Sequence, residues 1–230
     1  MTQLGWHVNI DNCIGCRGCE GACKQEFNLP TGVRRRRVLT EFGVTAGGVP
    51  QRRHISLACN HCETPACKAA CPVNRYWKDE PSQTDIAALR MYFGVPAAAP
   101  YTGLVGMRPT LAEDPVIGAD CTGCKRCMAA CPYGAPQWDE TNGVMDKCTG
   151  CLHRLHPPAD TTLPAARQKP ACQLSCTSFA LSFGELADVN TWAQRRTGDP
   201  VTVLTGATAG ASELADPSLT NPSIRFTPPR

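Results

Sequence analysis

The cysteines constrain this chain more than any other feature, because all sixteen of them fall into four groups of four. Groups one and three share the spacing C-x2-C-x2-C-x3-C, and group two has the spacing C-x2-C-x4-C-x3-C. Group four starts with C-x2-C and ends with C-x3-C, with twenty residues between these two pairs. The groups are, in order, Cys13, Cys16, Cys19 and Cys23; Cys59, Cys62, Cys67 and Cys71; Cys121, Cys124, Cys127 and Cys131; and Cys148, Cys151, Cys172 and Cys176. This grouping indicates a chain that folds around whatever its thiols bind.

A disulfide framework is the first alternative, since an even number of cysteines suggests one in a secreted chain. The first residues, MTQLGWHVNIDNC, contain no basic region followed by an apolar run, so we expect no signal peptide. No stretch of about 18 apolar residues predicts a transmembrane helix. Clustered thiols in a chain made in the cytosol bind metal more often than they form disulfides. Twenty glycines, twenty prolines and only 6% aromatic residues also favour a loop-rich protein held together by metal.

Zinc and iron–sulfur clusters require different cysteine spacings. A structural zinc site uses two C-x2-C pairs that are far apart, a pattern that only group four approaches. Three cysteines within seven residues, as in group one, suit a cubane cluster, because each thiolate can reach a different iron atom. The run C-x2-C-x2-C-x3-C is the bacterial ferredoxin spacing, in which the fourth cysteine ligates the other cluster of a pair. We therefore expect [4Fe-4S] clusters, with Cys23 outside the cluster of Cys13, Cys16 and Cys19.

Internal similarity predicts that the chain is a duplicated unit. The segment DNCIGCRGCEGACK at residues 11–24 aligns with ADCTGCKRCMAACP at 119–132, and PACKAAC at 65–71 aligns with PACQLSC at 170–176. Alternating apolar and polar residues predict strands at 6–10, 52–59 and 179–186. The predicted fold class is therefore α+β, with two bacterial-ferredoxin-like dicluster folds and loop-rich insertions.

The order of the four groups, together with HCETPAC at 61–67 and CPYGAP at 131–136, makes the chain resemble a known family. It is similar to the four-cluster iron–sulfur (beta) subunit of molybdopterin oxidoreductases of the dimethyl-sulfoxide-reductase type. The resemblance covers roughly residues 4–190 and specifies no substrate. It implies a non-catalytic subunit with four [4Fe-4S] clusters. Such a subunit passes single electrons between a molybdopterin-containing catalytic subunit and a membrane anchor or quinone-binding subunit.

The resemblance also implies which cysteines share a cluster, with groups one and four forming one pair of clusters and groups two and three the other. The implied sets are Cys13, Cys16, Cys19 and Cys176 for cluster one; Cys23, Cys148, Cys151 and Cys172 for cluster two; Cys59, Cys62, Cys67 and Cys131 for cluster three; and Cys71, Cys121, Cys124 and Cys127 for cluster four. Some relatives carry tryptophan in the region of Cys124 and hold a three-iron cluster. Because Cys124 is present here, all four clusters are expected to be [4Fe-4S].

The domain organisation follows from these sets. We expect one four-cluster domain at residues 1–190 and an extended C-terminal tail at 191–230. Its first cluster pair would come from residues 1–50 and 140–190, and its second pair from residues 51–139.

Two insertions and the tail exceed what a ferredoxin unit needs. The insertion at 75–115 contains a predicted helix at 84–95, which would dock on a neighbouring subunit or pack against its own core. The Pro-rich insertion at 153–170 is expected to form an ordered surface loop that closes on cluster two or contacts a partner. The tail has little capacity to form a core, so if it is ordered we expect it to lie against another chain.

Charge and motifs argue against other functions. The formal charge of +3 becomes roughly minus five once four oxidised clusters add about minus eight. The basic run at 34–37 lacks the interleaved aromatic residues of a nucleic-acid surface, so a solvated strand face or a subunit contact is expected. His61 is expected to hydrogen-bond near a cluster or to face solvent, because sixteen cysteines already supply every ligand. No phosphate-binding loop, nucleophile elbow or dinucleotide fingerprint is present.

Two functions remain open from the sequence. The first is the electron-transfer subunit described above, and the alternative is a free cytosolic polyferredoxin that serves a hydrogenase or another soluble reductase. For the first, the chain would associate with the membrane through its partner subunits. Relatives without a signal can be carried folded across the membrane with their catalytic partner, so both the cytoplasmic and the periplasmic side stay open.

Overall fold

The computed structural model describes residues 3–44, 47–78, 104–108, 119–155, 164, 167–186 and 215–227. The predicted helix at 84–95 and most of the insertion at 153–170 lie outside the described residues. The described helices are α1 (Gly18–Glu26), α2 (Ala66–Ala69), α4 (Arg126–Ala130), α5 (Leu152–Leu155), α6 (Ala171–Leu174) and the 3-10 turn η3 (Pro217–Leu219). The described strands are β1 (Leu4–Asn9), β2 (Arg36–Val44), β3 (Pro50–Ala58), β4 (Tyr76–Lys78), β5 (Val105–Met107), β6 (Gln137–Asp139), β7 (Val144–Asp146), β8 (Leu181–Glu185) and β9 (Ile224–Thr227).

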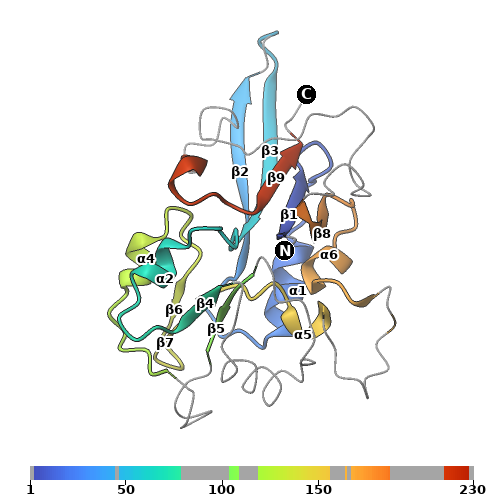
Figure 1. Cartoon of the computed structure of the whole chain (residues 1–230). Coiled ribbons are helices and arrows are strands. Elements are labelled where there is room, and N and C mark those ends of the chain that lie inside the picture. The colour runs from blue at the N-terminus through green and yellow to red at the C-terminus, as the bar shows by residue number, and fades with distance from the viewer. Residues whose placement is uncertain are drawn as a thin grey trace.

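The central sheet has the order β8-β1-β9 and joins the two ends of the chain (Figure 1). Strand β1 pairs antiparallel with β8, where Trp6 lies opposite Phe183, and parallel with β9, where Val8 lies opposite Phe226. The strands predicted at 6–10, 52–59 and 179–186 correspond to β1, β3 and β8, so these predictions are confirmed.

The C-terminal tail differs from its prediction. Ile224 and Phe226 are only 2% exposed and belong to the core cluster that also contains Trp6 and Val8. The expectation that an ordered tail would lie against another chain is therefore wrong for residues 215–227. The physical reason is the alternation of apolar residues in β9, which places Ile224 and Phe226 on one face and lets β1 supply the hydrogen-bonding partner.

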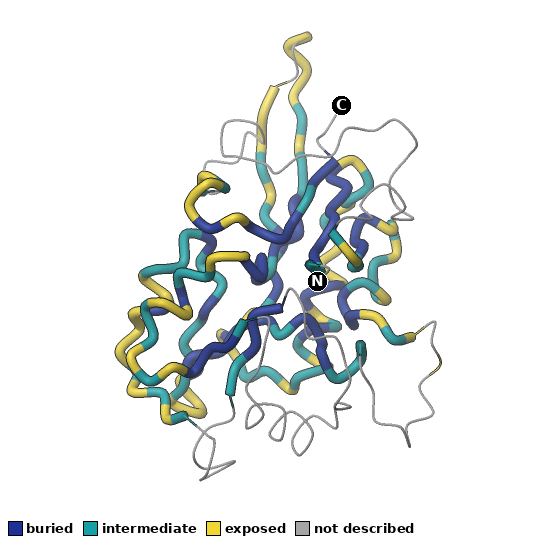
Figure 2. The backbone as a smooth tube through the Cα atoms, in the orientation of Figure 1, coloured by how far each residue is buried: buried dark blue, intermediate teal, exposed yellow. Residues whose placement is uncertain are grey.

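Strands β2 and β3 form a long hairpin that extends beyond the body of the molecule (Figures 1 and 2). The end near the body is buried, with Ile55 fully buried and Val38 packed in the same core. The distal end is exposed, and its apolar residues Phe42 and Val44 are 80% and 67% exposed. The hairpin thus contributes to the core only through its inner half.

The short helices form two packed pairs that lie on opposite sides of the hairpin in Figure 1. Helix α1, in cysteine group one, packs against α6 in group four, and α2 in group two packs against α4 in group three. The residues that precede α1 and α4 are Arg17 and Lys125, which occupy matching positions of the aligned segments. Both adopt the left-handed conformation, with φ of 59° and 55°. The two aligned segments therefore turn in the same way as each helix begins.

Candidate metal centres

Three cavities are each lined by four cysteines. One lies beside the loop before α1 and contains Cys13, Cys16, Cys19 and Cys176. The second lies between α2 and the loop after α4 and contains Cys59, Cys62, Cys67 and Cys131. The third contains Cys71, Cys121, Cys124 and Cys127. In each cavity the thiols come from two separate cysteine groups, and the sets are those that the family resemblance groups as clusters one, three and four.

The remaining four thiols also lie close to one another. Burial, and after it charge on Cys148 and Cys172, raises the pKa of the Cys23 thiol to about 12. Burial likewise raises the pKa of Cys151, with Cys172, Cys148 and Cys23 adding to the effect. All four are buried. The structure therefore gathers Cys23, Cys148, Cys151 and Cys172 into one set between α1, α5 and α6.

Burial and mutual repulsion raise the pKa of several of these thiols and so favour their neutral form unless a cation is bound. Burial raises the pKa of Cys67 to about 11 and also raises the pKa of Cys13, where Cys19 and Cys176 repel a thiolate. Iron binding requires thiolates, so the metal must displace their protons. The chemistry of the donor set, four converging thiols in each site, suits an iron–sulfur cluster.

Backbone amides point at many of the cysteine sulfurs. The Sγ atoms of Cys71, Cys121 and Cys148 each accept a hydrogen bond of 3.3 Å from the N–H of Arg75, Met145 and Gly150, respectively. The N–H of Ala180 donates to Cys176 Sγ at 3.1 Å. Such bonds stabilise negative charge on sulfur and raise the reduction potential of a bound cluster.

Glycine is favoured in the loop of group one. Gly15 has a φ of +71°, and a Cβ atom there would lie 2.6 Å from the ring of His54. The left-handed backbone disfavours a larger side chain, and a Cβ atom at this position would displace the His54 ring. The loop can therefore wrap closely around the cavity that Cys13 and Cys16 line.

Several buried polar groups beside the thiols have no hydrogen-bond partner in the described part of the chain. They include Trp6 Nε1 and His61 Nε2. A buried donor without a partner is costly, so these atoms indicate that an acceptor belongs nearby. An anionic cluster with sulfide corners would supply one, and the residues present thus fit such a group.

His61 is fully buried, so the solvent-facing alternative for its ring is wrong. Its Nδ1 accepts a 3.0 Å hydrogen bond from the N–H of Val105, and its carbonyl accepts one from Ser223 Oγ. Burial is the main reason that the pKa of His61 lies well below its usual value, with Lys147 adding to the effect. The ring is a neutral packing element beside the thiols.

The thiol sets follow one another through the molecule. Cys19 lies close enough to Cys172 to help raise the pKa of that thiol, behind the larger effects of burial and Cys148. Cys148 in turn adds to the burial that raises the pKa of Cys59. The set containing Cys23 thus lies between the set of Cys13 and the set of Cys59.

Tyr76 connects the next two sets. Burial raises the pKa of its hydroxyl, and charges on Cys127, Cys67 and Cys71 raise it further. Cys67 lines one cavity and the other two cysteines line the next. The four sets therefore form a row. Its two ends reach the surface, since Cys16 and Cys124 are the exposed cysteines.

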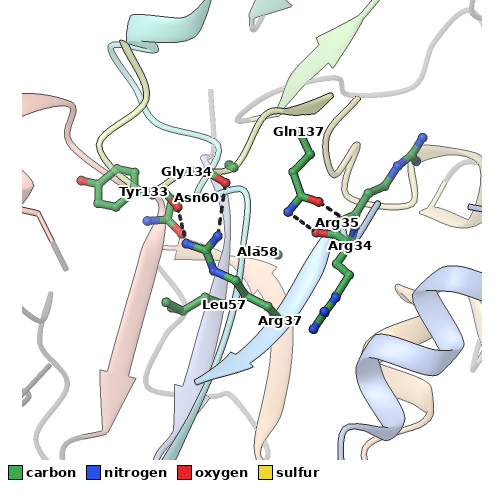
Figure 3. Close-up of a pocket in the computed structure, with 10 residues that line it drawn as sticks. Arg34, Arg35, Arg37, Leu57, Ala58, Asn60, Tyr133, Gly134 and Gln137 are labelled. Atoms are coloured by element: carbon green, nitrogen blue, oxygen red, sulfur yellow. Dashed lines mark hydrogen bonds between the residues drawn. The ribbon is translucent and has the colours of Figure 1, made fainter. Parts of the chain in front are cut away.

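In the basic run at 34–37 only Arg34 is exposed, so the expectation of a solvated strand face is wrong for the other three residues. Figure 3 shows Arg37 directed at Tyr133 and Gly134. Arg35 binds both carboxylate oxygens of Asp146 at 2.7 Å. Arg37 donates to the carbonyls of Tyr133 and Gly134, while Arg36 is only 2% exposed. Arg35 and Arg37 thus join the start of β2 to the segment that contains groups three and four.

Two contributors to the sites carried no sequence signal. Lys147 is buried, and its Nζ donates to the carbonyls of Val105 and Cys148. Thr220, in the tail, lines the cavity of Cys62. Burial raises the pKa of Cys62, and a hydrogen bond with the Thr220 side chain partly offsets this rise. A lone lysine and a threonine beyond the last cysteine follow no spacing that would have identified them.

Two further properties concern the described residues alone. None of their His, Cys, Asp and Glu side chains form a group of three or more that could hold a single metal ion. No helix among them has the length and apolar character needed to cross a membrane.

Comparison with protein families first defines the class. Residues 98–186 match a 4Fe-4S dicluster domain and residues 10–31 match a 4Fe-4S binding domain. The chain is therefore a ferredoxin-like iron–sulfur protein of mixed helices and strands.

Individual relatives define the family more closely. The B chain of anaerobic dimethyl sulfoxide reductase from Escherichia coli (strain K12) is 34% identical over 196 residues, which covers 82% of this chain and 76% of that protein. The B subunit of sulfite dehydrogenase from Allochromatium vinosum is 31% identical, covering 82% of this chain and 71% of its own. The formate dehydrogenase iron–sulfur subunit of Wolinella succinogenes is 29% identical, covering 80% and 82%. The chain belongs to the family of iron–sulfur subunits of dimethyl-sulfoxide-reductase-type enzymes.

Proposed function

We propose that this chain is the non-catalytic electron-transfer subunit of a molybdopterin oxidoreductase and that each of its four thiol sets holds one [4Fe-4S] cluster. A bound cluster of this kind accepts and releases one electron at a time. The observation that carries the proposal is the convergence of four thiols from distant cysteine groups on each of three cavities. The close set around Cys23 supplies the fourth site.

The row of thiol sets supports a linear path for electrons. Cys19 and Cys172 bring the first two sets together, and Cys148 and Cys59 do the same for the second and third. Because Cys16 and Cys124 reach the surface, electrons would enter and leave near these residues. The buried middle sets are protected from solvent, which keeps water and oxidants away from them.

The proposed organisation is a duplication. Groups one and four would build one dicluster unit and groups two and three the other, as the packing of α1 with α6 and of α2 with α4 supports. The matched left-handed turns at Arg17 and Lys125 support a common origin of the two units. Residues 1–190 would thus form the four-cluster domain, and residues 191–230 a tail whose described end packs on it.

The proposed partners are a molybdopterin-containing catalytic subunit and a membrane anchor or quinone-binding subunit. Relatives named as subunits of dimethyl sulfoxide reductase, sulfite dehydrogenase and formate dehydrogenase support the first partner. The same relatives do not favour the free polyferredoxin. The chain would then be held at the membrane by its partners.

The test is anaerobic purification of the native complex through a tag on this chain. We expect a large molybdenum-containing polypeptide to co-purify, and about sixteen iron and sixteen sulfide atoms per copy of this chain. Electron paramagnetic resonance should detect four reducible clusters. A preparation that contains this polypeptide alone, with full activity as an electron carrier, would contradict the proposed partners, and an iron-free native protein would contradict the clusters.

A further inference from the structure

Arg36 is a buried cation at the first residue of β2. Its side chain is 2% exposed and its guanidinium stacks on the ring of Trp6 at 4.2 Å. Nη1 donates a 3.0 Å hydrogen bond to Ser56 Oγ. Among the described residues no ion pair joins Arg36 to a carboxylate, and its guanidinium has the Cys172 thiol as a further hydrogen-bond partner.

The negative groups that face Arg36 are cysteines of two different sets. Burial acts to lower the pKa of Arg36, but charge on Cys172, Cys19, Cys148 and Cys23 raises it above its ordinary value. Cys19 belongs to the set of Cys13, whereas the other three belong to the set gathered around Cys23. The guanidinium therefore lies at the junction between two neighbouring sites.

A shared hydroxyl group and direct charge connect Arg36 to the same two sets. Ser56 Oγ, which accepts from Arg36, also lies 3.4 Å from Cys19 Sγ. On the other side, burial raises the pKa of Cys172 to about 11, and the positive charge of Arg36 opposes this rise. One fixed side chain thus acts on a ligand of each site, through its charge or through one hydroxyl group.

A buried cation without a carboxylate is unstable unless another anion balances it. Reduction of a [4Fe-4S] cluster adds one electron and makes no bond, so the cluster becomes more negative by one charge. A cation held nearby in a poorly screened interior favours the reduced form. Arginine keeps its charge at any accessible pH, so no proton accompanies the electron.

We propose that Arg36 is the shared counter-ion of clusters one and two and that it raises the reduction potentials of both. The inference rests on the proposed function, because it needs clusters at these two thiol sets. Arg36 is a positioning and tuning residue rather than a ligand. Its charge keeps clusters one and two, the first two on the electron path, both easier to reduce. Its stacking on Trp6 and its hydrogen bond to Ser56 hold that charge in place.

The test compares three variants of the intact complex, Arg36→Met, Arg36→Lys and Arg34→Met. Arg34 provides the matched control, because it lies two residues away but its side chain is 55% exposed, so solvent screens the same loss of charge. Iron content and spin quantification establish that the clusters are present. Redox titration followed by electron paramagnetic resonance then gives the midpoint potential of each cluster.

For Arg36→Met we expect the midpoints of clusters one and two to fall by at least a tenfold change in the reduction equilibrium, about 59 mV for one electron. Clusters three and four should keep their midpoints, and Arg34→Met should change none. Arg36→Lys keeps the charge and should retain midpoints closer to the parent. Unchanged midpoints for clusters one and two in a fully loaded Arg36→Met complex would overturn the inference and leave the proposed function intact.

A variant that fails to bind its clusters also gives an interpretable result. If Arg36→Met loses clusters one and two, Arg36→Lys decides, since a loaded lysine variant with parent midpoints supports the role of charge. Loss of both clusters from the lysine variant as well would overturn a tuning role. If the unmutated complex lacks clusters, the proposed function itself fails.

Discussion

Cys23 lies beside Cys148, although one belongs to the first cysteine group and the other to the last. Their proximity helps to raise the pKa of Cys23, behind the larger effect of burial. Cys19, one helical turn earlier in α1, instead lines the cavity of Cys13 and Cys176. Helix α1 therefore serves two sites, and a metal at each would join the two ends of the chain.

The tail should contribute strongly to stability. Phe226 is 2% exposed in β9, so Phe226→Ala should cost about 3–5 kcal/mol through lost packing and a cavity. Phe42→Ala is the matched control, because Phe42 is 80% exposed at the hairpin end and its loss should cost little. Resistance of the complex to protease during heating measures the difference. Equal behaviour of the two variants would contradict the placement of β9 in the core.

Replacing one member of the Arg35–Asp146 ion pair should destabilise the protein more than replacing both members. Both side chains are largely buried, with 12% and 9% exposed, and Arg35 also stacks on Phe27 at 4.1 Å. Asp146→Ala leaves a buried charge unpaired and should cost about 3–5 kcal/mol. The double variant Arg35→Met with Asp146→Ala should be less damaged than Asp146→Ala alone. The temperature at which visible absorbance is lost reports each effect, and a double variant worse than both single variants would contradict the pairing.

Stability should depend on pH through Glu26. Hydrogen bonds of 2.5 and 2.6 Å from Arg154 lower the pKa of Glu26; burial opposes this, and His153 reinforces it. A carboxyl with a lowered folded pKa stabilises the protein above its unfolded pKa of about 4.3, and this contribution disappears as pH falls through the folded value.

Glu26→Gln should therefore lose clusters faster than the parent near neutral pH, and the ratio of the two rates should approach one in acid. The ratio is measured from the decay of visible absorbance at a series of pH values. A ratio that grows as pH falls would have the wrong sign for this ion pair.

The cysteine spacing predicted the local runs of thiols, because short runs with fixed offsets specify local loops that do not depend on distant packing. Cys13 to Cys19 form such a run, and β1, β3 and β8 showed the alternation of half-buried strands. The pairing of distant cysteine groups was implied by the family resemblance and not by the spacing. Long-range pairing was harder to predict. The four residues of β9 follow a polar segment, and they become a core strand only because β1 offers an edge with which they can pair.

The basic run illustrates the second limit. Four consecutive charged residues resemble a solvated face, and their neutralising partners are scattered through the chain. Asp146 and the carbonyls of Tyr133 and Gly134 become neighbours only after folding. For Arg36 the partners are thiols of two sites, a relationship that no local pattern contains.

The central claim is that the first and last cysteine groups each contribute one ligand to the other group's cluster. Substitution of these two cysteines tests it most directly. In the intact complex, Cys23→Ser and Cys176→Ser are compared by electron paramagnetic resonance and iron content. Because Cys23 lies with Cys148 and Cys172, and Cys176 lines the cavity of Cys13, the effects should cross between groups. We predict that Cys23→Ser alters cluster two first and Cys176→Ser alters cluster one first. Loss of cluster one alone from Cys23→Ser would contradict the account.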